Sequence, residues 1–390
     1  MSDVSPARIG LLFDYVEEGG SFDENILPTL ELVVDDYVAQ GVLERPVEFS
    51  VRMVQGLPKG SFRAVRDAFF DFFANECPTT TVRAAAEGTG FDPPLWSSLV
   101  AMGAPGMALP ESLGGAGAAL TDLAVVADVA GAHLAPVPLI EHAVTARALA
   151  RAGGHDDLVA KLAEGSTLAT LALRPPTGDT ARLVPAGAVA DMFLHHCDGV
   201  TSISQGNAPG AKLPNTADLP LAHRVISDAT AIDLDADGWN RTVDEWRALT
   251  AVAYVGLAKR AIEIGVAYTK ERIQFGVLIG TFQALQHGFA DAATSVEGAH
   301  LLAQRAVWAL ETDQPGASRL AGMALLFAAE SARFAADRSV QYHGGYGFSE
   351  EYDIQLYHRH ATAWILQLGD PAAEYARLAD AEFGPVNGAA

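Results

Sequence analysis

The spacing of hydrophobic positions changes along the chain and separates stretches of different structure. From residue 61 the apolar positions follow a helical period. One face of the first helix expected there collects Phe62, Val65, Phe69 and Phe73. Short alternating runs return between about residues 165 and 234, and predict strands at 167–172 and 229–237. The pattern therefore predicts a helical region followed by a small β region.

The rest of the chain keeps a helical period over long stretches. Breaks fall only at glycine or proline positions, namely Gly276, Gly280, Pro315 and the pair Gly344 and Gly345. The predicted helices cover residues 243–273, 281–311, 316–342 and 353–367. Four consecutive long helices predict a bundle.

The first 60 residues have a pattern of their own. Apolar residues 9–13 and 46–54 predict two strands, with a helix at about 24–40 between them. This β-α-β segment resembles the opening of a periplasmic-type amino-acid-binding domain, but only the first unit is present. It also lacks the G-x-G-x-x-G fingerprint of a dinucleotide site. We expect a fused remnant without binding function, and a small-molecule binding module remains the alternative.

Composition narrows the function classes. With 390 residues and 49% hydrophobic content, the chain can form two or three domains. Its formal net charge of -22 disfavours nucleic acid and anionic membrane surfaces as partners. Cys77 and Cys197 have no metal-ligand spacing, so we expect reduced structural cysteines and no metal. No signal peptide and no apolar run of membrane-spanning length is found, and we expect a cytoplasmic protein.

Three segments resemble the acyl-CoA dehydrogenase family. AYTKERIQFGVLIGTFQALQHGFAD and RSVQYHGGYGFSEEYDIQLYHRHA are similar to its C-terminal helical domain, and MALPESLGGAGAALTDLAVVADVAG is similar to its N-terminal one. The resemblance covers about residues 61–385 and implies a mainly α fold. The implied domains are an N-terminal helical domain at 61–165, a reduced middle β domain at 166–238 and a C-terminal four-helix bundle at 239–390, preceded by the β-α-β segment 1–60.

The resemblance also implies FAD as cofactor, an acyl-CoA substrate, an electron-transfer acceptor protein and a homo- or hetero-oligomer. Arg272 is the residue implied to contact the FAD diphosphate, which a guanidinium binds by charge-assisted hydrogen bonds. The family positions around the adenine half of the cofactor hold Gln274, Phe275, Phe282 and Gln283. Glycines after a helix let backbone approach a ligand closely, which adds Gln341, Gly344 and Gly345 as FAD candidates.

The family reaction needs a carboxylate that removes the α-proton of the acyl-CoA. One usual family position for this base holds Leu368, and a second holds Trp246. Glu245 is the remaining candidate, but one helical residue is a rotation of about 100°, which should point its side chain elsewhere. A solvated glutamate in the first turn of a helix is the favoured interpretation of Glu245.

The middle region departs from the family as well. The threonine- and serine-containing loop that usually meets the flavin has no clear counterpart in residues 166–235. We therefore expect an oxidoreductase for α,β-dehydrogenation of an acyl-CoA thioester, of a steroid or another unusual acyl group, acting as a dimer or with a homologous partner subunit. The alternative is a catalytically silent structural subunit that contributes Arg272 and the loop 341–345 to a partner's FAD.

Overall fold

A computed structural model describes residues 7–13, 47–53, 60–205 and 209–384. The chain divides into two compact units, Met1–Phe62 and Arg63–Ala390. In the first unit, strands β1 (Ala7–Phe13) and β2 (Val47–Met53) pair in parallel along their whole length. Both predicted strands are confirmed, and the helix predicted between them lies outside the described residues.

The second unit begins with helices, as predicted. They are α2 (Gly60–Glu76), α3 (Thr79–Glu87), α4 (Pro93–Ala101), α5 (Leu120–Ala132), α6 (Leu139–Ala152) and α7 (Asp156–Ala163), with a 3₁₀ turn η1 (Glu111–Leu113). Phe69 and Phe73 of the predicted apolar face are buried in the core. The side chain of Asp92 caps α4 by accepting the Leu95 N–H at 2.7 Å.

A small β region follows. Strands β3 (Ala169–Leu171), β5 (Met192–Cys197), β6 (Val200–Gln205) and β8 (Thr230–Ala231) form one sheet in the order β3-β5-β6-β8, and β4 (Thr180–Val184) pairs with β7 (Ala222–Val225). The predicted strand at 167–172 is confirmed as β3. The strand predicted at 229–237 is wrong beyond Ala231, because Asp235 caps the next helix by accepting the Gly238 N–H at 2.8 Å.

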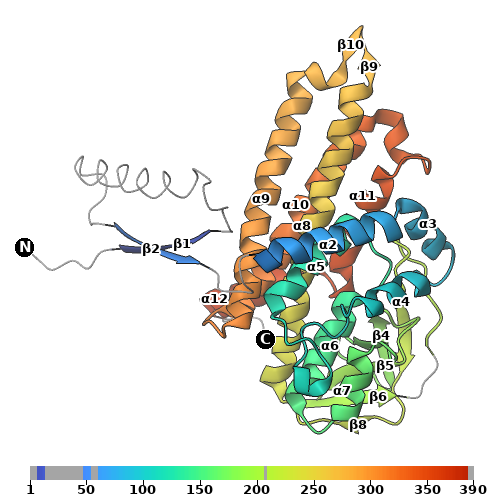
Figure 1. Cartoon of the computed structure of the whole chain (residues 1–390), viewed down its shortest axis with the longest axis vertical. Helices are drawn as coiled ribbons and strands as arrows, with labels where there is room; N and C mark the ends of the chain where they lie inside the picture. The colour runs from blue at the N-terminus through green and yellow to red at the C-terminus, as the bar shows by residue number, and fades with distance from the viewer. Residues whose placement is uncertain (1–6, 14–46, 54–59, 206–208, 385–390) are drawn as a thin grey trace, which may run out of the picture. The chain divides into compact units, whose positions relative to one another are not determined.

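The four long helices are confirmed, with shifted ends. They are α8 (Ala236–Glu271), α9 (Gln283–Glu311), α10 (Ala317–His343) and α11 (Ile354–Ala363), joined by 3₁₀ turns η2 (Ile279–Thr281), η3 (Gly344–Phe348) and η4 (Trp364–Gln367) and followed by α12 (Pro371–Phe383). A hairpin of β9 (Ile273–Gln274) and β10 (Val277–Leu278) joins α8 to α9. Within this unit, the hairpin lies at the end of the helices remote from the β region (Figure 1).

Helix α8 is the centre of the second unit. Every residue from Thr242 to Ala258 is buried, and a helix buried all round must pack against neighbours on each side. It approaches α5 closely, because a Cβ added at Gly256 would lie 1.9 Å from the carbonyl oxygen of Asp128. A Cβ at Gly131 would lie 2.1 Å from the carbonyl oxygen of Ala253. The two backbones are therefore in direct contact.

The remaining sequence predictions concern single features. Cys77 is buried, Cys197 is partly exposed, and both are free thiols. In the described parts of the chain, no helix combines the length and the apolar composition that a membrane crossing requires. The domain borders predicted at residues 60, 165 and 238 stay a prediction.

Candidate active site

Glu245 is fully buried, and the solvated first-turn position expected for it is wrong. Helix α8 begins at Ala236, so Glu245 lies well inside it rather than in its first turn. Its carboxylate lies 2.8 Å from Arg151 Nη1, 3.1 Å from Arg147 Nε and 3.4 Å from Arg241 Nε. Each acceptor oxygen thus has a guanidinium partner, as a buried charge requires.

The charge state of Glu245 follows from these arginines. Burial alone would raise its pKa, but the guanidiniums of Arg147 and Arg151 outweigh burial and hold the pKa below its usual value. A carboxylate with a lowered pKa and its oxygens committed to arginines is a poor proton acceptor. The geometry assigns Glu245 a structural place in the fold.

The two usual family positions for the base hold side chains that cannot accept a proton. Leu368 follows η4 and is half-buried. Trp246 is fully buried on α8, and its indole Nε1 donates to Oε1 of Glu141 at 3.1 Å. The side chains of Glu245 and Trp246 contact different residues of α6. The predicted rotation of Glu245 away from a base position stays a prediction.

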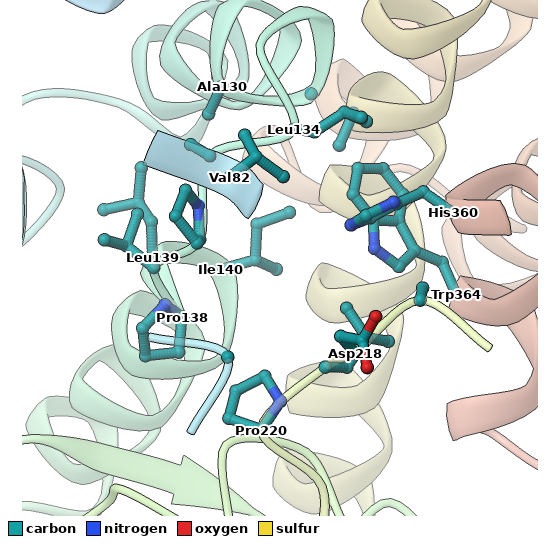
Figure 2. Close-up of a pocket in the computed structure, with 18 of the residues that line it drawn as sticks. Val82, Ala130, Leu134, Pro138, Leu139, Ile140, Asp218, Pro220, His360 and Trp364 are labelled. Atoms are coloured by element: carbon teal, nitrogen blue, oxygen red, sulfur yellow. The ribbon is translucent and has the colours of Figure 1, made fainter. Parts of the chain in front are cut away.

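A cavity of about 110 Å³ opens beside this tryptophan contact. Its walls come from α3, α5, α6, α8, α11 and the loop 217–220, and they are mainly apolar. Figure 2 shows Leu139 and Ile140 of α6 on one side, with His360 and Trp364 across the cavity. The volume is somewhat below the roughly 150 Å³ of a cavity that admits benzene, so a compact apolar group fits it.

Four ionisable side chains line this cavity, and two of them pair with each other. Arg359 Nη2 lies 2.5 Å from Oδ2 of Asp218, which also faces Lys212 at 3.9 Å. The others, Glu141 and His360, have no salt-bridge partner among the described residues. The cavity therefore has one internally neutralised charge pair and two polar groups open to a ligand.

The predicted FAD residues are brought together at the hairpin end of the helices. Arg272 follows α8 and lies over the ring of Tyr346 in η3, 5.6 Å from its centroid. That turn also holds Gly344 and Gly345, next to Gln341 at the end of α10. On the hairpin side, the predicted group is exposed and comprises Gln274, Phe275, Phe282 and Gln283.

These residues fit the diphosphate end of FAD. The half-buried guanidinium of Arg272 lies over the Tyr346 ring and makes no ion pair within the described residues. Gly344 has a φ of 61°, and a Cβ built on it or on Gly345 would meet no atom within 4 Å. An unpaired guanidinium beside open glycine backbone suits an anionic group.

Near Leu368, hydrogen bonds connect the β region to the turn η4. Arg174, just after β3, donates from Nη2 to the carbonyl oxygen of Leu366 at 2.5 Å and from Nε to that of Gln367 at 3.4 Å. These bonds tie the β region to the turn that precedes Leu368.

The fold described above is that of a helical flavoprotein dehydrogenase, and the comparisons with known proteins agree with it. The model of the acyl-CoA dehydrogenase N-terminal domain matches residues 61–161, and that of the C-terminal domain matches residues 237–369. The chain therefore belongs to the acyl-CoA dehydrogenase family. Enzymes of this family use FAD to oxidise a CH–CH bond of an acyl-CoA, which confirms the predicted fold class, activity class and cofactor.

Individual relatives cover most of the second unit. Acyl-CoA dehydrogenase IpdE2 of Mycolicibacterium smegmatis is 35% identical over 76% of this chain and 91% of its own length. IpdE2 of Mycobacterium tuberculosis is 32% identical over 80% of this chain and 94% of its own length. A variant of the Tcur3481-Tcur3483 steroid ACAD superposes with a TM-score of 0.76, at 28% identity, over 82% of this chain and 97% of that one. The ChsE4-ChsE5 complex of M. tuberculosis shares the fold. Its TM-score is 0.76 at 24% identity, over 83% of this chain and 98% of the matched chain.

The sequence did not reveal Glu141 and His360 as site residues. Each is a single polar residue in a helical segment, and a lone histidine is more often a packing residue than a functional one. The one available signal was an acidic residue, Glu141, within the otherwise apolar start of α6. Only the tertiary structure brings it to the cavity.

Proposed function

We propose that this chain is one subunit of a heteromeric acyl-CoA dehydrogenase whose proton-abstracting carboxylate comes from a homologous partner. The observation that carries the proposal is the combination at the base positions: Leu368 and Trp246 cannot accept a proton, and Glu245 is committed to arginines. The Tcur3481-Tcur3483 relative supports a two-component steroid-type enzyme. FAD, when bound, accepts the hydride that leaves the substrate β-carbon.

The contributions of this chain follow from its own residues. Arg272 would hold the FAD diphosphate, Gln341, Gly344 and Gly345 would add further contacts to FAD, and the adenine half would be surrounded by Gln274, Phe275, Phe282 and Gln283. The apolar cavity between α6 and α11 takes the acyl group and excludes water from it. Arg174 fixes the turn before Leu368 through its hydrogen bond to the carbonyl oxygen of Leu366.

The hairpin end supplies a surface for the partner subunit. Ile273 is 59% exposed, Phe275 is 92% exposed and Phe348 in η3 is 78% exposed. Large apolar side chains gathered beside a cofactor site are typical of a surface that another chain covers. We place the complex in the cytoplasm, with a separate electron-transfer protein as the acceptor of the reduced flavin's electrons.

The alternative is a silent structural subunit that binds no acyl group of its own. This alternative explains the side chains at the base positions equally well. It differs from the first proposal because the cavity of this chain then binds no ligand. Acyl-CoA binding distinguishes the two alternatives, measured on a complex in which the partner's base is replaced by glutamine. Acyl-CoA bound only by the partner subunit, one per partner, favours the silent subunit.

The test measures FAD stoichiometry and anaerobic flavin bleaching by a panel of acyl-CoAs, for the chain alone and for the chain produced together with a homologous dehydrogenase partner. We expect bleaching only with the partner. Bleaching by the chain alone would mean that the active site is complete and would overturn the proposal.

A pair of variants tests the FAD contacts within the same complex. Arg272→Gln removes the charge that faces the diphosphate, and loss of charge-assisted hydrogen bonds should weaken FAD binding by about ten- to one-hundredfold. Arg260→Gln, on the same helix α8 and paired with Glu263 at the surface, is the matched control. Equal FAD affinity in both variants would remove Arg272 from the site.

A further inference from the structure

We propose that Glu141 and His360 select an acyl group that carries an oxygen function, a ketone or a hydroxyl, away from the thioester. The inference rests on the proposed function, since it takes the cavity between α6 and α11 as the acyl site. It adds the chemistry of the group that the cavity accepts.

Glu141 presents a carboxyl group to the cavity without a neutralising charge. It lies in the first turn of α6, where Trp246 Nε1 and its own backbone N–H donate to it. No Lys, Arg or His forms a salt bridge with it among the described residues. Burial raises its pKa, although the two hydrogen bonds it accepts oppose that shift. A neutral carboxyl group has an O–H that can donate to a ligand oxygen.

His360 offers the complementary group. Its Nδ1 lies 2.8 Å from the carbonyl oxygen of Leu356, and a carbonyl can only accept, so Nδ1 carries the proton. Burial lowers the pKa of His360 to about 4, which keeps the ring neutral. Its Nε2 is then an acceptor, and no hydrogen bond to it occurs within the described ranges of the chain.

The rest of the cavity makes these two groups decisive. The neighbouring walls are formed by apolar side chains such as Leu134, Leu139 and Ile140, and Asp218 and Arg359 are already paired with each other. A purely alkyl group would offer no hydrogen-bond partner to a Glu141 O–H or to Nε2 of His360. Sites of this kind discriminate strongly against ligands that lack the expected oxygen.

The test compares two CoA thioesters of the same alicyclic acid, one with a ring ketone and one without, by calorimetric binding to the complex. We expect the ketone to bind at least about tenfold more tightly. Glu141→Leu should abolish the preference. Glu141→Gln should retain it, because the amide still donates a hydrogen bond from the same position.

Further outcomes decide between the proposals. Equal binding of the two thioesters to the unaltered complex overturns the selection by oxygen and leaves the heteromeric enzyme standing. No binding of either thioester by this chain's cavity, as judged with the partner's own site blocked, overturns both. If Glu141→Gln binds the ketone normally but the flavin is no longer reduced, Glu141 is the base, and both the selective role and the supply of the base by the partner fail.

An infrared measurement gives a readout independent of activity. A neutral Glu141 should give a carboxylic acid C=O band at neutral pH that is absent in Glu141→Gln and shifts when the ketone thioester binds. His360→Phe, which keeps an aromatic ring against Trp364, should leave this band in place. An identical spectrum for the unaltered protein and Glu141→Gln would mean that Glu141 is ionised and would overturn the donor role.

Discussion

Glu141 of α6 and Glu245 of α8 are both carboxyl groups, yet their neighbours shift their pKa values in opposite directions. Burial raises the pKa of each. For Glu245, Arg147 and Arg151 outweigh that effect, whereas Glu141 receives only neutral donors. The direction of each pKa shift therefore depends on which side chains of α6 and α8 face the carboxyl.

Replacing Glu245 should destabilise the fold strongly. Glu245→Gln removes the buried counter-charge of Arg147 and Arg151. Breaking a buried ion pair costs about 3–5 kcal/mol, and because the two arginine side chains are 15% and 29% exposed, we expect a loss at the lower end of that range. Chemical denaturation measures the free energy of unfolding. The control is Glu263→Gln, which breaks an exposed pair and should cost less than about 1 kcal/mol. Equal losses for the two variants would contradict the structural role.

The same ion pairs predict an acid dependence. The folded-state pKa of Glu245 is below the ordinary value, so its stabilising contribution is complete above about pH 4.5 and is lost as pH falls through the lowered folded value. The difference in unfolding free energy between the unaltered protein and Glu245→Gln should therefore be constant at neutral pH and shrink in acid. A difference that grows as pH falls would contradict the assignment.

The sequence indicated Glu245 as a residue of interest but not its environment. Arg147 and Arg151 belong to α6, almost a hundred residues earlier, and no local spacing connects them to α8. The partnership of Glu141 with Trp246 is equally long-range. Side-chain identity can be read from sequence, whereas the sign of a pKa shift requires the tertiary neighbours.

At the scale of the element, the crossing of α5 and α8 depends on two glycines. A side chain at Gly131 or Gly256 would overlap backbone atoms of the opposite helix rather than the flexible end of a side chain. Backbone cannot move aside locally, so any added atom must separate the helices. The buried length of α8 makes this crossing central to the core.

A single methyl group at this crossing should therefore be costly. Gly256→Ala should lower the free energy of unfolding by at least about 1–3 kcal/mol through overpacking, measured by denaturant titration. Gly345→Ala is the control, because its added Cβ meets no atom within 4 Å. A stable Gly256→Ala protein would show that α5 and α8 can separate without loss.

Elements were predictable to the extent that their signals are local. Long helical periods predicted the ends of α9 and α10 to within a few residues. Helix α8 begins earlier than predicted, at Ala236, because Asp235 caps it. The β5–β6 hairpin turns at Asp198 and Gly199, both with positive φ, which is a local Asp-Gly turn signal. The order of strands in the sheet is set by long-range contacts and could not be predicted.

At the scale of the whole molecule, the chain consists of two separately compact units. The family models match only the second, from residue 61 onward. The resemblance of residues 1–60 to a periplasmic-type binding domain stays a prediction, since most of that segment lies outside the described residues.

Removing the first unit should leave the second intact. A chain that begins at Gly60 keeps all of α2 and the core around Phe69 and Phe73. We expect it to unfold cooperatively at the melting temperature of the full chain, with unchanged FAD content in the complex, as calorimetry and flavin absorbance would measure. A large fall in melting temperature would mean that residues 1–59 support the dehydrogenase unit.

The contact between α5 and α8 also limits how this protein can acquire new substrates. Gly131 and Ala253, which meet at the crossing, both line the cavity, so that wall has a fixed position. Laboratory evolution of ligand preference would have to act through the opposite walls, at Ile140 on α6 and at His360 and Trp364 near the end of α11. A library of variants at those positions would change the shape of the cavity and leave the contact between α5 and α8 intact.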